Sequence, residues 1–279
     1  MSNHSIRFTK MQALGNDFVV IDGVNQKITL NKSQIAQLGE RHLGIGFDQL
    51  LLIESSDTAD FFCRIFNNDG TEAEQCGNGL RCVARFIHEQ KLHAGPTILI
   101  ATKSGKYEVF IKNYDAIRMS MGVPTFEPEK IPFTATSQQK IYELPLLDDR
   151  TLSATVLALG NPHAVIRVDS IAETPIKQWG SHFSTHPLFP QGVNVGFMEI
   201  VDKSHIILRT FERGAGETHA CGSNASASAV AGILNGWLAS KVQVDFRYGS
   251  LWIEWDGEHS LVYMTGPAVR VFDGQFLSL

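Results

Sequence analysis

The chain has 279 residues, 43% hydrophobic and 19% charged, a composition typical of a globular protein large enough for two domains with their own cores. Its formal net charge is −5 and it has no basic run, so nucleic acid and acidic membrane surfaces are not expected partners. Four cysteines do not make a disulfide framework at this length, and neither a signal peptide nor a membrane span is visible, so we expect a protein of the reducing cytoplasm.

The first half predicts short strands around two helices. Asn31 or Ser33 is expected to cap a short helix that runs to His42. Apolar residues recur at helical spacing after Cys76, which predicts a second helix to about Lys91. Strands are predicted at residues 6–11, 18–22, 50–54, 61–66, 98–102, 107–112 and 117–121.

The second half predicts a similar order. A proline-containing stretch from 122 to 132 is expected to cross between two domains. A helix is predicted around Ile171–Trp179, and Cys221 opens a long alanine-rich helix. Strands are predicted at residues 155–159, 163–168, 195–201, 205–211, 242–246, 251–255 and 261–264.

An internal repeat relates the two halves at a constant offset of 145 residues. Chance matches would not all share one offset, so the repeat indicates duplicated domains. The five correspondences are Leu14-Gly15-Asn16 with Leu159-Gly160-Asn161, Gln49 with Asn194, Asn67 with Glu212, Glu72 with Glu217, and Cys76-Gly77 with Cys221-Gly222.

Each half combines several strands with one main helix, mostly through short turns. This favours an α+β fold in which a mixed or antiparallel sheet wraps around a central helix. We predict two pseudo-symmetric domains, one of residues 1–121 plus 267–279 that carries Cys76, and one of residues 122–266 that carries Cys221. The active site is expected in the cleft between them. No GxGxxG after a strand, P-loop or HExxH motif occurs.

The repeat places two thiols at predicted helix N-termini. Backbone N–H groups and the helix dipole stabilise a thiolate there and lower its pKa, and the same turn can hold a carboxylate. If the halves face each other, one thiolate can remove an α-proton while the opposite thiol returns one, which is two-base epimerisation or racemisation. Cys63 and Cys82 are expected to be buried apolar residues, and no metal site is expected, because the spacing of Cys76 and Cys82 fits no zinc motif.

Extended motifs make the chain resemble the diaminopimelate epimerase family over essentially its whole length. These motifs lie at residues 14–18, 44–49, 67–82 (NNDGTEAEQCGNGLRC), 160–163, 211–218 (FERGAGET) and 220–223. The resemblance implies a cofactor-free isomerase, a cytoplasmic homodimer, that interconverts LL- and meso-2,6-diaminopimelate in lysine and peptidoglycan precursor synthesis.

The resemblance also implies residue roles. Cys76 and Cys221 would be the acid/base pair, and His163 and Glu212 would adjust the protonation of these thiols, which need unequal environments because only one is ionised at a time. Backbone N–H groups of Gly77, Asn78, Gly222 and Ser223 would hold the reacting α-carboxylate. Other substrate contacts would come from Asn16, Gln49, Asn67, Asn161, Asn194, Glu212 and Arg213.

The chain departs from the family pattern at Asn224, where most members have glycine after the equivalent of Ser223. If this position requires a positive φ, asparagine is the least costly replacement.

Two alternatives stay open. A related racemase of the proline type would use the same cysteines, although a small substrate would not need the polar cluster of Asn67, Asn161, Asn194 and Arg213. A non-catalytic redox-switch or binding protein would instead join Cys76 and Cys221 in a regulatory disulfide.

Overall fold

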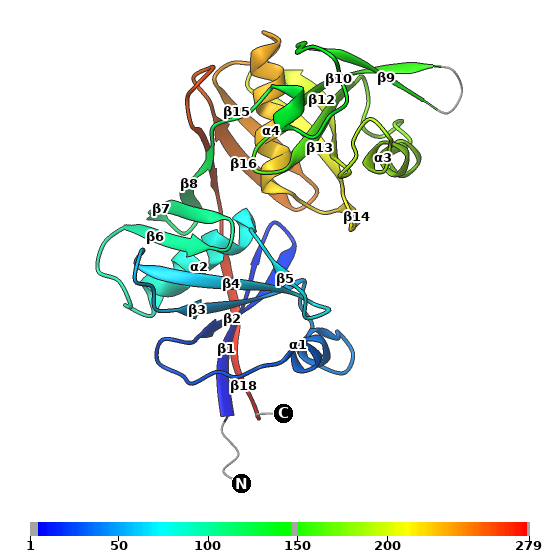
Figure 1. Ribbon diagram of the computed structural model, residues 1–279. Coiled ribbons are helices and arrows are strands. Elements are labelled where there is room, and N and C mark those ends of the chain that lie inside the picture. Colours follow the sequence, from blue (N-terminus) through cyan, green and yellow to red (C-terminus); the bar gives the residue numbers. More distant parts are fainter. Residues whose placement is uncertain (1–4, 147–149, 278–279) are drawn as a thin grey trace. The chain divides into compact units, whose positions relative to one another are not determined.

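In the computed structural model, which describes residues 5–146 and 150–277, the chain forms two compact units (Figure 1). Unit 1 comprises Met1–Met119 and Gly266–Leu279, and unit 2 comprises Ser120–Thr265. Residues 1–4, 147–149 and 278–279, which the predicted domain ranges include, lie outside the described residues.

Unit 1 is a mixed sheet with two helices. Its pairings run β1–β2 antiparallel, β2–β3 parallel, β3–β4 antiparallel, β4–β6 parallel, and β6–β7 and β7–β8 antiparallel. The last strand, β18, pairs antiparallel with β1. The elements are β1 (Ser5–Ala13), β2 (Asn16–Asp22), α1 (Lys32–Gly39), β3 (Gln49–Glu54), β4 (Phe61–Asn67), β5 (Glu72–Ala73), α2 (Gly77–Glu89), β6 (Thr97–Thr102), β7 (Gly105–Asn113), β8 (Ala116–Gly122) and β18 (Val269–Leu277).

Unit 2 repeats this order of pairings. They run β10–β11 antiparallel, β11–β12 parallel, β12–β13 antiparallel, β13–β15 parallel, and β15–β16 and β16–β17 antiparallel. The elements are η1 (Pro128–Lys130), β9 (Tyr142–Pro145), β10 (Thr151–Ala158), β11 (Pro162–Val168), α3 (Ile176–Ser184), β12 (Asn194–Asp202), β13 (His205–Glu212), β14 (Gly216–Thr218), α4 (Gly222–Leu234), β15 (Lys241–Phe246), β16 (Gly249–Glu254) and β17 (Val262–Gly266).

The repeat extends to strand register and helix length. Phe18 lies opposite Gln49 in the β2–β3 pair, and His163 lies opposite Asn194 in the β11–β12 pair, at the same offset. Helices α2 and α4 both have 13 residues and begin at equivalent glycines. The predicted α+β class, with the same element order in both halves, is confirmed.

Helices α2 and α4 are the central helices of their units. In α2, Leu80, Val83 and Ile87 are fully buried, and the helix packs against β1, β2, β3 and β7. In α4 every residue from Asn224 to Gly232 is buried. Such burial suits its small side chains, because alanine and serine let the surrounding strands approach closely.

Helix α3 differs from its prediction. The helix expected at Ile171–Trp179 begins only at Ile176, after Pro175 at its N-cap. Proline disfavours the α region for the residue before it, so the helix cannot start upstream of Thr174 and continue through.

Helix α1 is shorter than predicted. It begins after Asn31, whose side chain accepts from the Gln34 N–H, but it ends at Gly39 instead of His42. The N–H groups of Ile45 and Gly46 both donate to the Leu38 carbonyl, so the chain turns back across the helix end.

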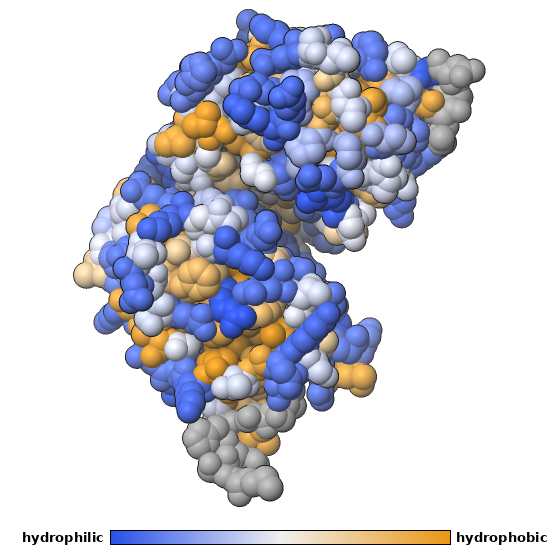
Figure 2. All heavy atoms as spheres, viewed as in Figure 1, coloured by the Kyte–Doolittle hydropathy of each residue, from blue (hydrophilic) through white to orange (hydrophobic). Residues whose placement is uncertain are grey.

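Hydrophilic residues cover most of the face shown in Figure 2, and hydrophobic residues gather in patches between them. Exposed apolar side chains such as Leu43 and Leu277 are scattered, as is usual for globular proteins. Among the described residues, no helix has the length and apolarity needed to cross a membrane.

Candidate active site

Cys76 and Cys221 are the N-cap residues of α2 and α4. Both have extended backbones, with φ −152° and ψ 105° at Cys76 and φ −132° and ψ 116° at Cys221. An N-cap side chain lies beside the first-turn N–H groups, which have no acceptor within the helix. The Gly79 N–H donates to Cys76 Sγ at 3.4 Å. Both cysteines are free thiols.

In unit 1, Asn16 lies beside the Cys76 thiol. Its Oδ1 atom accepts from the Cys76 thiol at 3.8 Å and from Asn78 Nδ2 at 3.3 Å. Its Nδ2 atom donates to Asp48 Oδ2 at 2.9 Å. The structure thus brings three predicted site residues together, Asn16, Cys76 and Asn78.

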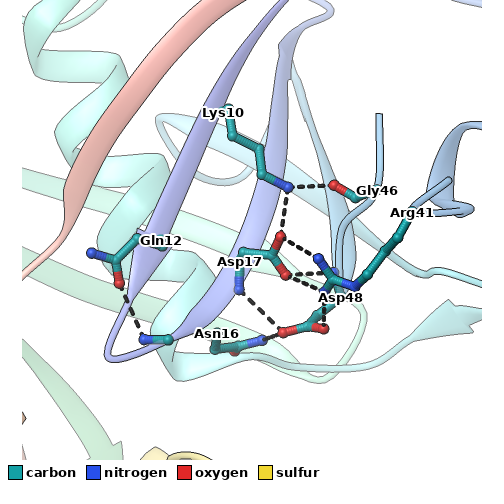
Figure 3. Close-up of polar contacts among 8 residues, drawn as sticks. Lys10, Gln12, Asn16, Asp17, Arg41, Gly46 and Asp48 are labelled. Atoms are coloured by element: carbon teal, nitrogen blue, oxygen red, sulfur yellow. Dashed lines mark hydrogen bonds and ion pairs between the residues drawn. The ribbon is translucent and has the colours of Figure 1, made fainter. Parts of the chain in front are cut away.

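A network of charged side chains surrounds Asp17 and Asp48, next to Asn16 (Figure 3). Asp17 receives hydrogen bonds from Lys10 at 2.6 Å and from Arg41 at 2.7 and 3.0 Å, and Arg41 also donates to Asp48 at 2.8 Å. Although burial raises the pKa of Asp17, these hydrogen bonds outweigh it and lower that pKa to about 2. The Asp17 N–H donates to Asp48 Oδ2 at 3.1 Å, so the network fixes the carboxylate that holds Asn16.

Arg81 holds the first turn of α2 from within the core. It is fully buried, and its guanidinium donates to Asn78 Oδ1 at 2.8 Å, to the Pro267 carbonyl at 3.2 Å and to the Gly77 carbonyl at 3.5 Å. Burial lowers the pKa of Arg81 to about 10, which leaves it charged at neutral pH. By this contact with Asn78, Arg81 sets how that side chain meets Asn16.

Gln49 and Asn67 form a second group in unit 1. They lie opposite each other in the β3–β4 register, and Gln49 Nε2 donates to Asn67 Oδ1 at 3.0 Å. The Asn67 amide donates in turn to Thr71 Oγ1 at 3.1 Å. Gln49 Oε1 is buried and has no hydrogen-bond partner among the described residues.

In unit 2, the Cys221 thiol faces the Glu212 carboxylate. Burial raises the pKa of Cys221 well above its ordinary value, and the charge of Glu212 raises it further. Hydrogen bonds with Ser223, whose Oγ lies 3.3 Å from Sγ, and with the Asn224 N–H oppose this only in part. The helix N-terminus alone would lower the pKa of Cys221 and favour a thiolate. Burial and the Glu212 carboxylate raise this pKa by more, so the protonated thiol is favoured.

Asn161 and His163 are in direct contact. His163 is fully buried at the start of β11, and its Nε2 atom is 2.8 Å from Asn161 Oδ1. Burial lowers the pKa of His163 to about 3, the charge of Arg213 lowers it as well, and a side-chain hydrogen bond with Asn224 acts in the opposite direction. His163 is therefore neutral at physiological pH.

Asn194 and Arg213 are joined through the backbone. Asn194 Oδ1 accepts from the Arg213 N–H at 2.9 Å, and the Arg213 guanidinium donates to the Gln191 carbonyl at 2.5 Å. Thr218 donates from its hydroxyl to Glu212, which fixes the carboxylate beside Cys221.

Asn224 does not occupy a position of positive φ. It is the third residue of α4, so the condition under which asparagine would replace glycine for its backbone conformation is not met. Its side chain is fully buried and donates from Nδ2 to the Val195 carbonyl at 3.0 Å. The asparagine is accommodated by a hydrogen bond to β12.

The predicted site residues thus form one set in each unit. Unit 1 gathers Asn16, Cys76, Gly77 and Asn78, with Gln49 and Asn67 as a linked pair, and unit 2 gathers Cys221, Gly222, Ser223 and Glu212, with the linked pairs Asn161–His163 and Asn194–Arg213. The described residues contain no group of three or more His, Cys, Asp or Glu side chains that could hold a metal ion.

Three supporting residues were not predicted. Asp48 lies in the Gly-Ile-Gly-Phe-Asp-Gln motif, and Thr218 is close to Glu212 in sequence, so both were within marked segments. Arg81 lies in the motif of residues 67–82 and stands between two core residues of α2, Leu80 and Cys82, so an arginine flanked by core residues was a second signal.

Comparison with known proteins shows a family match. The model of the diaminopimelate epimerase family matches residues 8–127 and 155–271. The chain is 47% identical over 272 residues to the diaminopimelate epimerase of Ectopseudomonas mendocina (strain ymp), covering 97% of this chain and 98% of that one. It is 49% identical over 271 residues to that of Nitrosospira multiformis, with the same coverage.

Solved structures share the fold at low sequence identity. A predicted epimerase from Pseudomonas aeruginosa superposes with a TM-score of 0.70 at 16% identity, over 98% of this chain and 100% of that one. A hydroxyproline epimerase from Agrobacterium vitis, with bound trans-4-hydroxy-L-proline, also has a TM-score of 0.70, at 13% identity and covering 98% and 92% of the two chains.

Proposed function

Because the chain belongs to the diaminopimelate epimerase family, and is an epimerase, we propose that it converts LL- to meso-2,6-diaminopimelate by a two-base mechanism with one thiolate and one thiol. The supporting observation is that Cys76 and Cys221 occupy the same N-cap position on equivalent 13-residue helices. Two thiols at equivalent positions suit a reaction that needs one acid/base group for each face of a carbon atom.

The two cysteines have different partners, which supports an assignment of roles. The carboxylate of Glu212 and burial favour the protonated form of Cys221. The Gly79 N–H donates to Cys76 Sγ, a contact that a thiolate accepts well, and the long contact from the protonated thiol to Asn16 Oδ1 is given up when Cys76 ionises. We therefore assign Cys76 as the base and Cys221 as the acid in the enzyme that receives the LL isomer.

The proposed step balances without any other reactant. Cys76 thiolate takes the α-proton, and the electron pair of the broken C–H bond remains on the α-carbon and its carboxylate. The S–H bond of Cys221 breaks, and its proton joins the opposite face of that carbon. The enzyme then holds a Cys76 thiol and a Cys221 thiolate, and proton exchange with water restores the starting state.

Helix N-termini supply the expected stabilisation of the carbanion. Negative charge grows on the α-carboxylate as the C–H bond breaks, and backbone N–H groups at a helix end are suited to hold it. We assign the N–H groups of Gly77, Asn78, Gly222 and Ser223 as these donors.

The remaining predicted contacts match a substrate with two amino-acid ends. Amide and guanidinium groups can bind carboxylates, and amide oxygens and Glu212 can accept from ammonium groups. We assign this task to Asn16, Gln49, Asn67, Asn161, Asn194, Glu212 and Arg213. So many polar groups exceed what a single imino acid requires, which favours diaminopimelate over a proline-type substrate.

The cellular setting follows from the same proposal. The enzyme would serve lysine and peptidoglycan precursor synthesis in the cytoplasm, as a homodimer, and without a metal or organic cofactor.

Exchange in heavy water tests the proposal. Reduced protein, treated with chelator and given no pyridoxal phosphate, is incubated with LL-diaminopimelate in D₂O, and the α-proton signal is followed by NMR. We expect loss of that signal and formation of the meso isomer. A protein that gives neither has another function, and exchange with proline but not diaminopimelate would identify the proline-type racemase.

Cysteine variants test the two-base assignment. Cys76→Ala and Cys221→Ala should each abolish epimerisation, whereas the matched control Cys63→Ala, at a buried thiol outside the site, should retain it. Full turnover by either of the first two variants is incompatible with the mechanism.

A further inference from the structure

Three buried polar side chains, those of Asn224, Ser228 and His163, form a cluster where α4 packs against β11 and β12. Asn224 and Ser228 are one turn apart on α4, and both are fully buried. They lie against Gly196 of β12, where an added Cβ would be 2.6 Å from Asn224 Oδ1 and 2.8 Å from Ser228 Oγ. Only glycine at position 196 therefore lets these two polar side chains sit against the strand.

The Asn224 amide has a fixed orientation. Its Nδ2 atom donates to the Val195 carbonyl at 3.0 Å, and reversing the amide would place two oxygen atoms against each other. The Oδ1 atom therefore points to the other side, toward Ser228 and His163.

Three buried atoms in this cluster lack a partner at normal hydrogen-bond geometry among the described residues. They are Asn224 Oδ1, His163 Nδ1 and Ser228 Oγ. A buried polar atom without a partner costs about 1–3 kcal/mol, so these atoms must satisfy one another. Asn224 Oδ1 can only accept, whereas the imidazole N–H and the hydroxyl can both donate to it.

The buried ring of His163 is neutral at physiological pH, so it carries a single N–H proton, either on Nδ1 or on Nε2. A proton on Nε2 would serve Asn161 Oδ1, 2.8 Å away, but would leave Nδ1 as a lone pair facing the Asn224 oxygen. A proton on Nδ1 satisfies Asn224, and the Asn161 amide can then turn to donate from Nδ2 to Nε2. The two ends of an amide have the same shape, so this turn changes no packing.

We propose that Asn224 is a positioning residue that holds His163 as its Nδ1–H tautomer, and thereby turns the Asn161 amide so that its oxygen faces away from His163 and accepts from a substrate ammonium group. The contact between the Asn161 oxygen and a substrate ammonium group rests on the proposed function. The tautomer is a property of the protein alone.

NMR of protein labelled with [¹⁵N]histidine tests the tautomer directly, with the His163 signals identified by their loss in His163→Gln. We expect His163 to carry its proton on Nδ1 at neutral pH. In Asn224→Ala the proton should move to Nε2, and in Ser226→Ala, whose hydroxyl donates to the Gly222 carbonyl instead of joining the cluster, it should stay on Nδ1. A wild-type Nε2–H tautomer overturns the proposal whether or not Asn224→Ala folds, as does an unchanged tautomer in that variant.

Kinetics test the consequence for substrate. Loss of one well-placed hydrogen bond corresponds to about five- to tenfold in affinity. Asn224→Ala should therefore raise KM by about that factor with a smaller change in kcat, while Ser226→Ala should leave both within about twofold. An unchanged KM beside a changed tautomer would overturn the role of Asn161 but not the tautomer, and a protein inactive on diaminopimelate would still give the NMR result.

Discussion

Asp48 holds Asn16 in one orientation. Its Oδ2 atom accepts from Asn16 Nδ2 at 2.9 Å, so the Asn16 oxygen must face Cys76 Sγ, 3.8 Å away, and the Asn78 amide. The carboxylate of Asp48 is itself held by Arg41 and by the Asp17 N–H. In unit 2 the equivalent residue, Asn161, contacts the His163 ring instead of a carboxylate. Equivalent asparagines in the two units are therefore oriented by different groups.

Removing this carboxylate should impair catalysis. In Asp48→Ala the Asn16 amide loses a charge-assisted hydrogen bond, worth roughly 1.5–3 kcal/mol, and can turn away from Cys76. We expect kcat/KM for epimerisation to fall by about tenfold or more. Arg41→Gln is the matched control, because it removes the ion pairs of an exposed side chain and leaves the Asp48–Asn16 contact. Equal activity of Asp48→Ala and the wild type would show that Asn16 needs no such support.

Replacing Arg81 should destabilise unit 1. Arg81→Met leaves the buried Asn78 Oδ1 and the part-buried carbonyls of Gly77 and Pro267 without their donor, and we expect the free energy of unfolding to fall by about 3 kcal/mol or more, measured by urea denaturation.

Arg85→Met is the control for Arg81. Arg85, one turn further along α2, also donates to a backbone carbonyl of the last segment, that of Ala268, but touches no site residue. Its loss should lower stability without lowering kcat of the folded enzyme, whereas Arg81→Met should lower both. A fully active Arg81→Met enzyme would limit Arg81 to a structural role.

Glu212 should control the ionisation of Cys221. Glu212→Gln removes the negative charge that raises the thiol's pKa, so the pH at which Cys221 becomes reactive should move downward. The rate of iodoacetamide alkylation, followed by mass spectrometry of the peptide containing Cys221, measures this pH. Cys63, whose pKa burial also raises, is the internal control and should not respond. An upward or absent shift at Cys221 contradicts the electrostatic role of Glu212.

His163 should make the protein less stable in mild acid. The folded-state pKa is lowered to about 3 by burial, whereas an unfolded histidine titrates near its ordinary value of 6.5. Between these values the unfolded chain binds the extra proton, so the contribution of neutral His163 is fully present above about pH 6.5 and is lost as the pH falls toward 3.

The measurement is the free energy of unfolding across this pH range. The part due to His163 should have a slope of at most about 1.4 kcal/mol per pH unit. His163→Gln should lose that slope, while replacement of the exposed His42 should not change it. Parallel curves for the wild type and His163→Gln would mean that His163 is not buried neutral in solution.

The parts of the fold that follow local patterns were predictable. Apolar periodicity after each Cys-Gly pair, together with the repeat offset, located both central helices and placed Cys76 and Cys221 at their N-termini. Prediction failed where the local pattern was ambiguous. Helix α3 begins later than predicted, after Pro175. Strands β9 and β18 were not predicted, because they are defined by pairing with β10 and β1.

The supporting contacts of the site could not be predicted, because they depend on residues far apart in sequence. The Asp48–Asn16 contact spans 32 residues and the Arg81–Pro267 contact spans 186. Asn224 shows the limit most directly. Its sequence position suggested a backbone explanation, but its actual neighbours, Val195 and His163, are set by the packing of α4 on the sheet.

The pairing of β1 with β18 has a consequence for synthesis on the ribosome. Ser5 lies opposite Leu277, so unit 1 joins a segment before unit 2 to a segment after it, whereas unit 2 is one continuous segment, Ser120–Thr265. Unit 2 can fold as soon as it has left the exit tunnel, while the edge of unit 1 stays open until β18 has also emerged. The half that carries Cys76 therefore matures last, and during that interval the unpaired edge of β1 is the part of the nascent protein most exposed to wrong partners.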